Sequence, residues 1–300
     1  MRDTPVNGDF DYTTAFSRNL GLISPTEQLV LRNTRVALAG LGGVGGSHAT
    51  TLARTGIGAF TIADPDLFEW ANDNRQAGCM TSTIGQPKVD VLGNMIRSIN
   101  PTAQVRSLHA IDDSTIADFL TEVDIVIDGL DFFAVQARRL LYREARLRGI
   151  PVVGAGPIGT SAIWQVYLPD SMPWEDFFAM SLAEDDLDRW ALFYLGNAPA
   201  GLHLQSIDAS SLRLSEKRGP SLALAVQMCS GVAAAELLKI CLGRGPVYAS
   251  PYHQQFDAYT QRFARTYLRW GLRGPIQRLR FTMLRRTIRA MVQATLGKPP

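Results

Sequence analysis

Several polar residues in the first half of the chain have the types and spacing expected of a nucleotide site. The glycine-rich segment GLGGVGG (40–46) follows an apolar stretch, and glycines there let backbone N–H groups approach an anion. Asp64 closes the next apolar stretch, where an acid can bind the hydroxyls of a ribose. Asn72, Arg75 and Lys88 follow along the chain. The glycine-rich segment alone is more typical of NAD(P) or FAD sites, and Asp64 suits NAD and ATP equally, so the later residues must decide between these nucleotides.

Strands and helices are predicted to alternate around these residues. The spacing of apolar residues predicts strands at 34–42, 59–66, 103–110, 124–131 and 151–159, and helices at 46–58, 88–101, 114–123 and 133–150. This alternation predicts an α/β, Rossmann-like, doubly wound fold, in which a mostly parallel sheet has helices on both faces. Ligands bind such sheets at the carboxyl ends of the strands.

One more acid is expected at this edge of the sheet. Asp131 is predicted to end the strand 124–131, which places it in the same cavity as the polar residues above. Arg75 and Lys88 could hold a polyphosphate and stabilise charge in a displacement at phosphorus, and Asp131 could hold Mg²⁺. Hydride transfer needs none of these groups. They therefore favour ATP with Mg²⁺ over a nicotinamide cofactor.

The sequence pattern changes after residue 160. It predicts a strand at 160–169, an irregular acidic region at 170–219, an apolar helix at 220–243, a short extended piece at 247–259 and a basic helix at 276–296. We therefore expect an α+β C-terminal half and a basic C-terminal helix. The expected organisation is an N-terminal arm and helix (1–33), a nucleotide-binding Rossmann-like domain (34–160), the substrate-side half of the same domain (161–243) and a basic C-terminal extension (244–300).

Charge is distributed unevenly along the chain. The net charge is +2, but residues 258–300 contain ten Lys or Arg and no acid, which leaves −8 on the remainder. In the predicted helix 276–296, apolar residues recur at helical spacing at 276, 279, 283, 284, 288, 291 and 292, with Arg278, Arg285 and Arg289 on another side. We expect this helix to dock on the acidic body of its own or a partner subunit. An acidic carrier protein and peripheral contact with an anionic membrane are less favoured partners, and no nucleic acid is expected.

The cysteines and the N-terminus bear on the cellular compartment. There are three cysteines, an odd number without C-x-x-C spacing, which argues against a disulfide framework and a four-thiolate zinc site. The N-terminus lacks the apolar segment of a secretory signal, and no uninterrupted apolar run reaches the roughly 18 residues that span a bilayer. We therefore expect a cytoplasmic protein.

Five motifs occur in a specific order along the chain. They are RVALAGLGGVGG (35–46), NDNRQ (72–76), TIGQPKVDVL (83–92), INP (99–101) and DIVIDGLD (124–131). Over about residues 16–160 they resemble the ThiF/MoeB/HesA family of adenylyltransferases, which are related to ubiquitin-activating enzymes. The resemblance implies that a carboxylate attacks the α-phosphate of ATP·Mg²⁺ and that an acyl-adenylate and pyrophosphate form. The carboxylate would belong to the C-terminus of a ubiquitin-like or small carrier protein, to a peptide or to a small molecule.

The resemblance also implies a role for each matching residue. Gly40, Gly42 and Gly43 would lie against the nucleotide, and Asp64 would bind the ribose. Asn72, Arg75 and Lys88 would contact the phosphates, and Asp131 would hold the magnesium ion. Arg18, in FSRN (16–19), resembles an N-terminal arginine that reaches the γ-phosphate in the partner subunit. It implies a homodimer in which Arg18 acts in trans, so that the catalytic residues would be Arg18, Arg75, Lys88 and Asp131.

The chain departs from the family pattern at several places. Asp73 replaces an apolar residue of the usual NLxRQ motif, and Phe132 replaces the asparagine of the usual TDN. The family's zinc-binding C-x-x-C pairs are absent. No cysteine occurs within 170–220, so we expect direct transfer of the adenylate without a thioester relay.

Three other functions compete with this interpretation. The tRNA threonylcarbamoyladenosine dehydratases of the same superfamily use the same adenylation step. An NAD(P)-dependent oxidoreductase would explain the glycines and Asp64 but would leave Arg75, Lys88 and Asp131 without a task. A non-catalytic scaffold partner of a heterodimer would typically have lost the arginine or the metal-binding aspartate, and this chain retains both.

Overall fold

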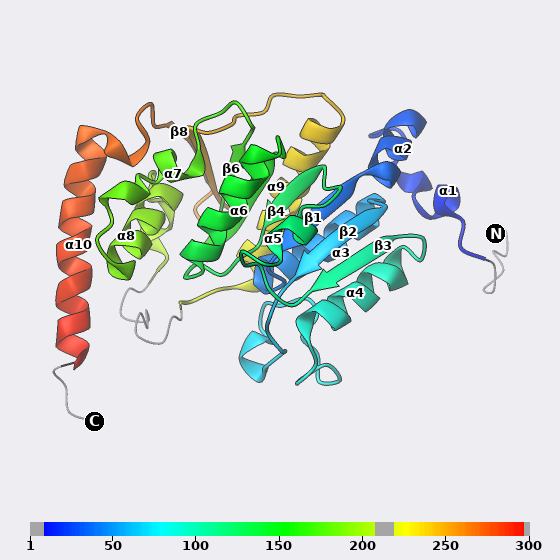
Figure 1. The fold of residues 1–300 in the computed structure, drawn as a ribbon, viewed down its shortest axis with the longest axis horizontal. Helices are drawn as coiled ribbons and strands as arrows, with labels where there is room; N and C mark the ends of the chain where they lie inside the picture. Colours follow the sequence, from blue (N-terminus) through cyan, green and yellow to red (C-terminus); the bar gives the residue numbers. More distant parts are fainter. Residues whose placement is uncertain (1–8, 208–218, 297–300) are drawn as a thin grey trace.

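An eight-stranded sheet runs through the chain in the order β3-β2-β1-β4-β5-β6-β7-β8 (Figure 1). The strands are β1 (Arg35–Ala39), β2 (Ala59–Ala63), β3 (Gln104–Leu108), β4 (Ile125–Asp128), β5 (Val152–Ile158), β6 (Ser161–Tyr167), β7 (Tyr252–Asp257) and β8 (Arg262–Tyr267). The α-helices are α1 (Tyr12–Ala15), α2 (Pro25–Asn33), α3 (Gly43–Thr55), α4 (Lys88–Ile99), α5 (Ile116–Phe119), α6 (Val135–Leu147), α7 (Trp174–Phe177), α8 (Asp186–Asn197), α9 (Ala223–Cys241) and α10 (Pro275–Leu296).

This computed structural model describes residues 9–207 and 219–296, with side chains as far as Ala290. The first eight residues of the expected N-terminal arm and residues 208–218 of the expected substrate-side half lie outside the described residues.

The strand directions confirm the α/β fold and show a mixed sheet. The four neighbouring pairs in the order β3-β2-β1-β4-β5 are parallel, and the pairs β5–β6, β6–β7 and β7–β8 are antiparallel. The sequence predicted the extended piece that contains β7 but missed β8. The reason is that β8 is the last strand of the sheet and is exposed along much of its length, so that it lacks the apolar alternation of a half-buried strand.

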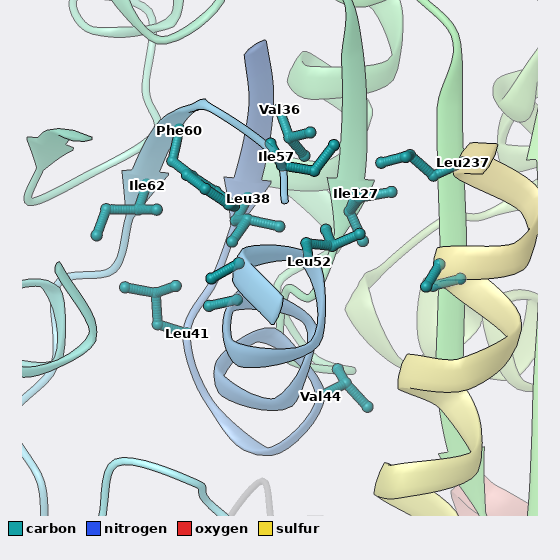
Figure 2. Packing of buried hydrophobic residues seen from close by; sticks show 14 of the residues in the cluster. Val36, Leu38, Leu41, Val44, Leu52, Ile57, Phe60, Ile62, Ile127 and Leu237 are labelled. Atoms are coloured by element: carbon teal, nitrogen blue, oxygen red, sulfur yellow. The ribbon is translucent and has the colours of Figure 1, made fainter. Parts of the chain in front are cut away.

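Two hydrophobic clusters cover the two faces of the sheet, as a doubly wound fold requires. Alternate residues of a strand point to opposite faces: Val36 and Leu38 of β1 join one cluster, while Ala37 and Ala39 join the other. The first cluster packs α3, α4 and α9 against the sheet, and Figure 2 shows its residues around α3 with Leu237 of α9 at one side. The second packs α5, α6, α7 and α8.

Helix α9 is long and apolar enough to cross a membrane by length and composition. It packs instead against α3, β5 and β6, and Ala225, Val226, Cys229 and Leu237 are almost completely buried. We therefore interpret α9, the predicted apolar helix, as a core helix.

The region predicted to be irregular (170–219) contains a regular helix, α8. Its N-cap is Asp185, whose side chain accepts a hydrogen bond from the Asp188 backbone N–H. The run of acids in AEDDLD (183–188) was therefore a helix start, because acids are favoured at N-caps and in first turns. The prediction of an irregular region is therefore wrong for Asp186–Asn197.

Helix α10 docks on α8 of its own chain, which confirms the predicted docking on the acidic body. Arg285 pairs with Asp188 at 2.8 Å, and Arg289 pairs with Asp185 at 2.7 Å. Asp188 is fully buried, so it needs a cation to compensate its charge. These pairs turn the arginine side of α10 inward together with Phe281, and part of the predicted apolar face is left outside.

Candidate active site

Two glycines of the turn after β1 are required by the packing of the backbone itself. Gly40 has a φ of +83°, and a Cβ added to it would lie 2.6 Å from the carbonyl oxygen of Gly129. A Cβ on Gly45 would lie 1.9 Å from the carbonyl oxygen of Gly40. The turn after β1, the start of α3 and the turn after β4 therefore meet in backbone contact, and this contact brings the Asp131 loop beside the glycine-rich turn.

Gly42 and Gly43 lie in a different environment. A Cβ on Gly42 would meet only Nε2 of Gln76, at 3.8 Å, and one on Gly43 would be in ordinary contact with Val226 and Arg75. The fold itself therefore tolerates a side chain at Gly42, and its glycine leaves space in front of the backbone. Gly42 is the N-cap of α3 without a side-chain cap, so the first N–H groups of the helix can bind an anion there.

Asp64 lies immediately after β2 and is tied to the glycine-rich turn. Its Oδ2 accepts a hydrogen bond from the Leu41 N–H at 2.6 Å, and its Oδ1 accepts one from the Asp66 N–H at 2.9 Å. The residue is only 6% exposed, and burial raises the pKa of the carboxyl group, an effect that the Lys88 ammonium opposes. Asp64 therefore lies at the carboxyl end of β2, where the sequence placed it.

Lys88 lies at the start of α4 and is 5% exposed. Its Nζ is 2.9 Å from Oδ2 of Asp66 and 3.9 Å from Oδ1 of Asp64. The structure therefore brings the predicted lysine and the predicted acid together at the end of β2. Asp66, which the sequence interpretation did not use, helps to hold Lys88 in this position.

The NDNRQ segment lies over the start of α3. Nη1 of Arg75 donates to the carbonyl of Ala71 at 2.9 Å and to Oδ1 of Asn74 at 2.8 Å, and its Cγ would be 3.6 Å from a Cβ on Gly43. Asn72 uses its Oδ1 locally, as the acceptor for the Glu69 N–H at 3.0 Å, which leaves its Nδ2 to contact a ligand. Both residues are partly exposed, so they are accessible to a phosphate.

Gln76 was not among the predicted site residues. It is 6% exposed and lies next to Gly42, and its Oε1 is buried without a hydrogen-bond partner among the residues that the structure describes. A buried acceptor without a donor costs free energy unless a ligand supplies one. The final residue of the NDNRQ motif was the signal that could have identified it.

Asp131 does not end a strand, which corrects the predicted strand 124–131. Strand β4 ends at Asp128, whose Oδ1 accepts from the Leu130 N–H at 3.0 Å and starts a turn. Asp131 lies exposed in the following loop, and its Oδ1 accepts from the Phe133 N–H. Within 9–207 and 219–296, no group of three or more His, Cys, Asp or Glu residues could hold a metal. A metal ion at Asp131 would therefore need oxygens of a nucleotide as further ligands.

A buried ion pair beneath this loop was also missed. Nε of Arg138 lies 2.7 Å from Oδ2 of Asp128, and its Nη2 donates to the carbonyl of Leu130 at 2.7 Å. Nη1 donates to the carbonyl of Asp131 at 3.2 Å, so one arginine fixes both the strand end and the loop. Tyr142 donates to Asp128 at 3.0 Å. The available signal was an arginine on the apolar side of the helix 133–150, beside Val135, Leu141 and Ala145.

Replacing Arg138 with methionine is expected to lower the free energy of unfolding by about 3–5 kcal/mol, because Asp128 would remain buried without its cation. The matched control is Arg139→Met, which removes the half-exposed pair with Glu175 and should cost under about 1 kcal/mol. Urea denaturation of both variants measures the difference, and equal losses would contradict the role given to Arg138.

Arg18 is not part of the site within one chain. It is exposed in a short 3-10 helix (Ser17–Asn19), and its neighbour Asn19 donates to the carbonyl of Thr55 at 3.1 Å, at the C-terminal end of α3. Gly42 and Gly43 lie at the opposite end of α3, about 20 Å away at 1.5 Å per residue.

If Asp64 is the ribose-binding acid, ribose hydroxyls would donate to its ionised carboxylate, and ATP affinity is expected to fall as the pH drops through the raised pKa of Asp64. Since burial raises this pKa, the loss should begin at a higher pH than for an ordinary aspartate. The Asp64→Asn variant should bind ATP more weakly but without this component of the pH profile. Titration of ATP at a series of pH values, compared between the two proteins, isolates Asp64 from the titration of ATP itself. Identical profiles would contradict the assignment.

The family model of the ThiF family matches residues 16–270. The tRNA threonylcarbamoyladenosine dehydratase of Bacillus subtilis is 37% identical over 142 residues, which cover 47% of this chain and 55% of the relative. The molybdopterin-synthase adenylyltransferase of Escherichia coli is 36% identical over 110 residues, covering 36% of this chain and 44% of the relative. The chain thus spans about half the length of these curated relatives.

A solved structure of E. coli MccB with ATP superposes with a TM-score of 0.65 at 19% identity, over 88% of this chain and 72% of MccB. At this identity the likeness shows that the two chains share a fold.

Proposed function

The chain belongs to the ThiF family, and we propose that it is an ATP-dependent adenylyltransferase that joins a substrate carboxylate to AMP and releases pyrophosphate. The observation that carries this proposal is the environment of Gly42 and Gly43. They leave space in front of the uncapped start of α3, with Arg75 beside them. Asp64 is bonded to the same turn, and Lys88 lies next to Asp64.

Each group has a task in this reaction. Asp64 accepts hydrogen bonds from the ribose, and the N–H groups at the start of α3 bind the phosphates together with Arg75 and Lys88. These fixed donors and cations stabilise the negative charge that develops while the carboxylate oxygen bonds to the α-phosphorus and pyrophosphate leaves. Asp131 would hold Mg²⁺, which neutralises phosphate charge when bound. Arg138 keeps the backbone of the Asp131 loop in position.

For the substrate we propose a carboxylate at the C-terminus of a small carrier protein or peptide. The acyl group of its adenylate would pass directly to an acceptor, without a thioester intermediate. The relative from E. coli is named as an adenylyltransferase of molybdopterin synthase, which supports a protein substrate. The second candidate is the dehydration of threonylcarbamoyladenosine in tRNA. It is favoured by the 37% identity to the B. subtilis enzyme.

Exchange of labelled pyrophosphate into ATP tests the proposal. The pure protein is incubated with ATP, Mg²⁺ and, in separate reactions, peptides that end in glycine or tRNA that carries threonylcarbamoyladenosine. Exchange that depends on a peptide or carrier supports the first substrate, and exchange that depends on the modified tRNA supports the second. Tight binding of NAD(P)H without binding of ATP would overturn the proposed reaction.

We further propose that the enzyme is a homodimer in which Arg18 completes the site of the partner. Arg18 is exposed and too far from its own glycine-rich turn. Close to it in the sequence, Leu20, Leu22, Leu29 and Val30 are 42%, 81%, 53% and 42% exposed, and a second copy would cover such apolar side chains.

Mixing two inactive variants is expected to restore activity if Arg18 acts in trans. Arg18→Ala and Lys88→Ala should each be inactive alone. In a mixed dimer, one site receives intact Lys88 and an intact Arg18 from the other chain, so random mixing should recover about a quarter of the wild-type exchange. Arg54→Ala, an exposed arginine at the same end of α3, is the control and should stay active alone. No recovery on mixing would contradict the trans arrangement.

A further inference from the structure

Helix α10 has two faces with different surroundings. The inner face packs on α8 through Phe281 and the ion pairs of Arg285 and Arg289. On the outer face, Ile276, Leu279 and Met283 are 67%, 63% and 62% exposed. Their spacing of three and four residues places them in one line along the helix, because successive residues are about 100° apart. Figure 1 shows α10 at one end of the molecule, with α8 on its inner side.

Arginines border this apolar line on both sides. At about 100° per residue, Arg280 and Arg286 lie about 60° to either side of the line. Both are exposed, and neither forms an ion pair with any side chain in the described ranges 9–207 and 219–290. Nη1 of Arg280 donates only to the carbonyl of Pro199, at 3.2 Å. The outer face thus combines three large apolar side chains with two uncompensated cations.

The turn before α10 also combines an exposed apolar side chain with an arginine. Trp270 is 61% exposed and lies near Gly274, where a Cβ would be 3.9 Å from its ring. The guanidinium of Arg269 is 5.7 Å from the centre of the Trp270 ring. No acid occurs anywhere in residues 258–300 to offset these cations.

We propose that the outer face of α10 binds the surface of an anionic lipid bilayer. An interfacial helix places its apolar side chains roughly 5–10 Å into the boundary of headgroups and acyl chains, with cations at the level of the phosphates. Ile276, Leu279 and Met283 are the inserted side chains, and Arg280 and Arg286 meet the headgroups. The ion pairs with α8 hold α10 in place before binding, so membrane binding does not have to include the entropy cost of ordering this helix.

The charges favour a bilayer over the other occupants of this face. A second copy of the helix would bring its own Arg280 and Arg286 against those of the first, and like charges repel. A protein partner would need an apolar groove with carboxylates along both walls. An anionic bilayer supplies the apolar layer and the flanking negative charge through its composition alone.

Sedimentation with vesicles tests this proposal on the full chain. The probes are vesicles of phosphatidylcholine alone and vesicles with about 30% phosphatidylserine, at low and high salt. We expect the protein to pellet with the anionic vesicles, to stay in solution with the neutral ones, and to bind less at high salt. The double variant Leu279→Asp/Met283→Asp should bind at least about tenfold more weakly. The control, Leu147→Asp, changes a side chain that is 73% exposed on α6 and should bind like the wild type.

Three results would overturn the proposal. The first is failure of the wild type to bind anionic vesicles, and the second is equal binding by the double variant. The third is a change from dimer to monomer in the double variant, measured by light scattering. That change would assign the outer face of α10 to contact with a second copy. Circular dichroism checks that the double variant keeps its helices. Pyrophosphate exchange should be unchanged in it, so failure of this proposal is separate from failure of the proposed reaction.

Discussion

Replacing Lys88 with methionine is expected to lower pyrophosphate exchange about 10³-fold, because the proposed site would lose a fixed cation where negative charge would develop on the phosphates. Methionine keeps the apolar stem in the buried position and removes only the ammonium group. A second effect adds to the first. Lys88 opposes the burial that raises the pKa of Asp64, so without it the pKa of Asp64 should rise further and weaken ribose binding.

Arg97→Met is the matched control for this variant, since it removes an exposed cation from the same helix, α4. It should retain normal exchange. Exchange by Lys88→Met within about threefold of the wild type would remove Lys88 from the proposed site.

The second large effect concerns two glycines that lie three residues apart. Gly42→Ala is expected to lower ATP affinity at least about 100-fold and to leave thermal stability unchanged, because the new methyl group fills space for the ligand and touches no protein atom closely. Gly45→Ala should do the reverse and lower stability by about 1–3 kcal/mol, because its methyl group would overlap the carbonyl oxygen of Gly40.

Calorimetric titration with ATP and thermal unfolding of both variants separate the two effects. A Gly42→Ala protein that binds ATP normally would show that the space in front of Gly42 has no role in binding. Unchanged stability of Gly45→Ala would mean that the contact between the two turns can relax.

The sequence could predict the position of a site residue where that position follows directly from the order of the strands. Asp64 comes straight after a buried strand, so its place at the carboxyl edge followed from the sheet. Asp131 was assigned to the right edge but to the wrong element, because the side chain of Asp128 ends β4 and starts a turn. In DIVIDGLD (124–131), Asp128 and Asp131 both follow the apolar residues, so the sequence does not show which of them ends the strand.

Buried charges were the main source of error, because a hydrophobic pattern treats every charge as solvated. The Asp128–Arg138 pair is almost completely buried, and each residue depends on a partner ten positions away. A buried charge also sets the orientation of α10. Arg285 faces inward because it pairs with buried Asp188, and Leu279 is therefore exposed to solvent. These outcomes depend on which charges compensate one another in three dimensions, and spacing along the chain does not record that.

The pairing of β5 with β6 has a mechanical consequence. Seven consecutive residue pairs, from Val152↔Tyr167 to Ile158↔Ser161, join the parallel half of the sheet to the antiparallel half. Such an unbroken ladder of hydrogen bonds leaves no hinge between the two halves of the sheet, so a hinge motion of one half relative to the other is not expected. Any movement of the chain around a bound ligand is therefore expected in the connections at the carboxyl edge and not within the sheet.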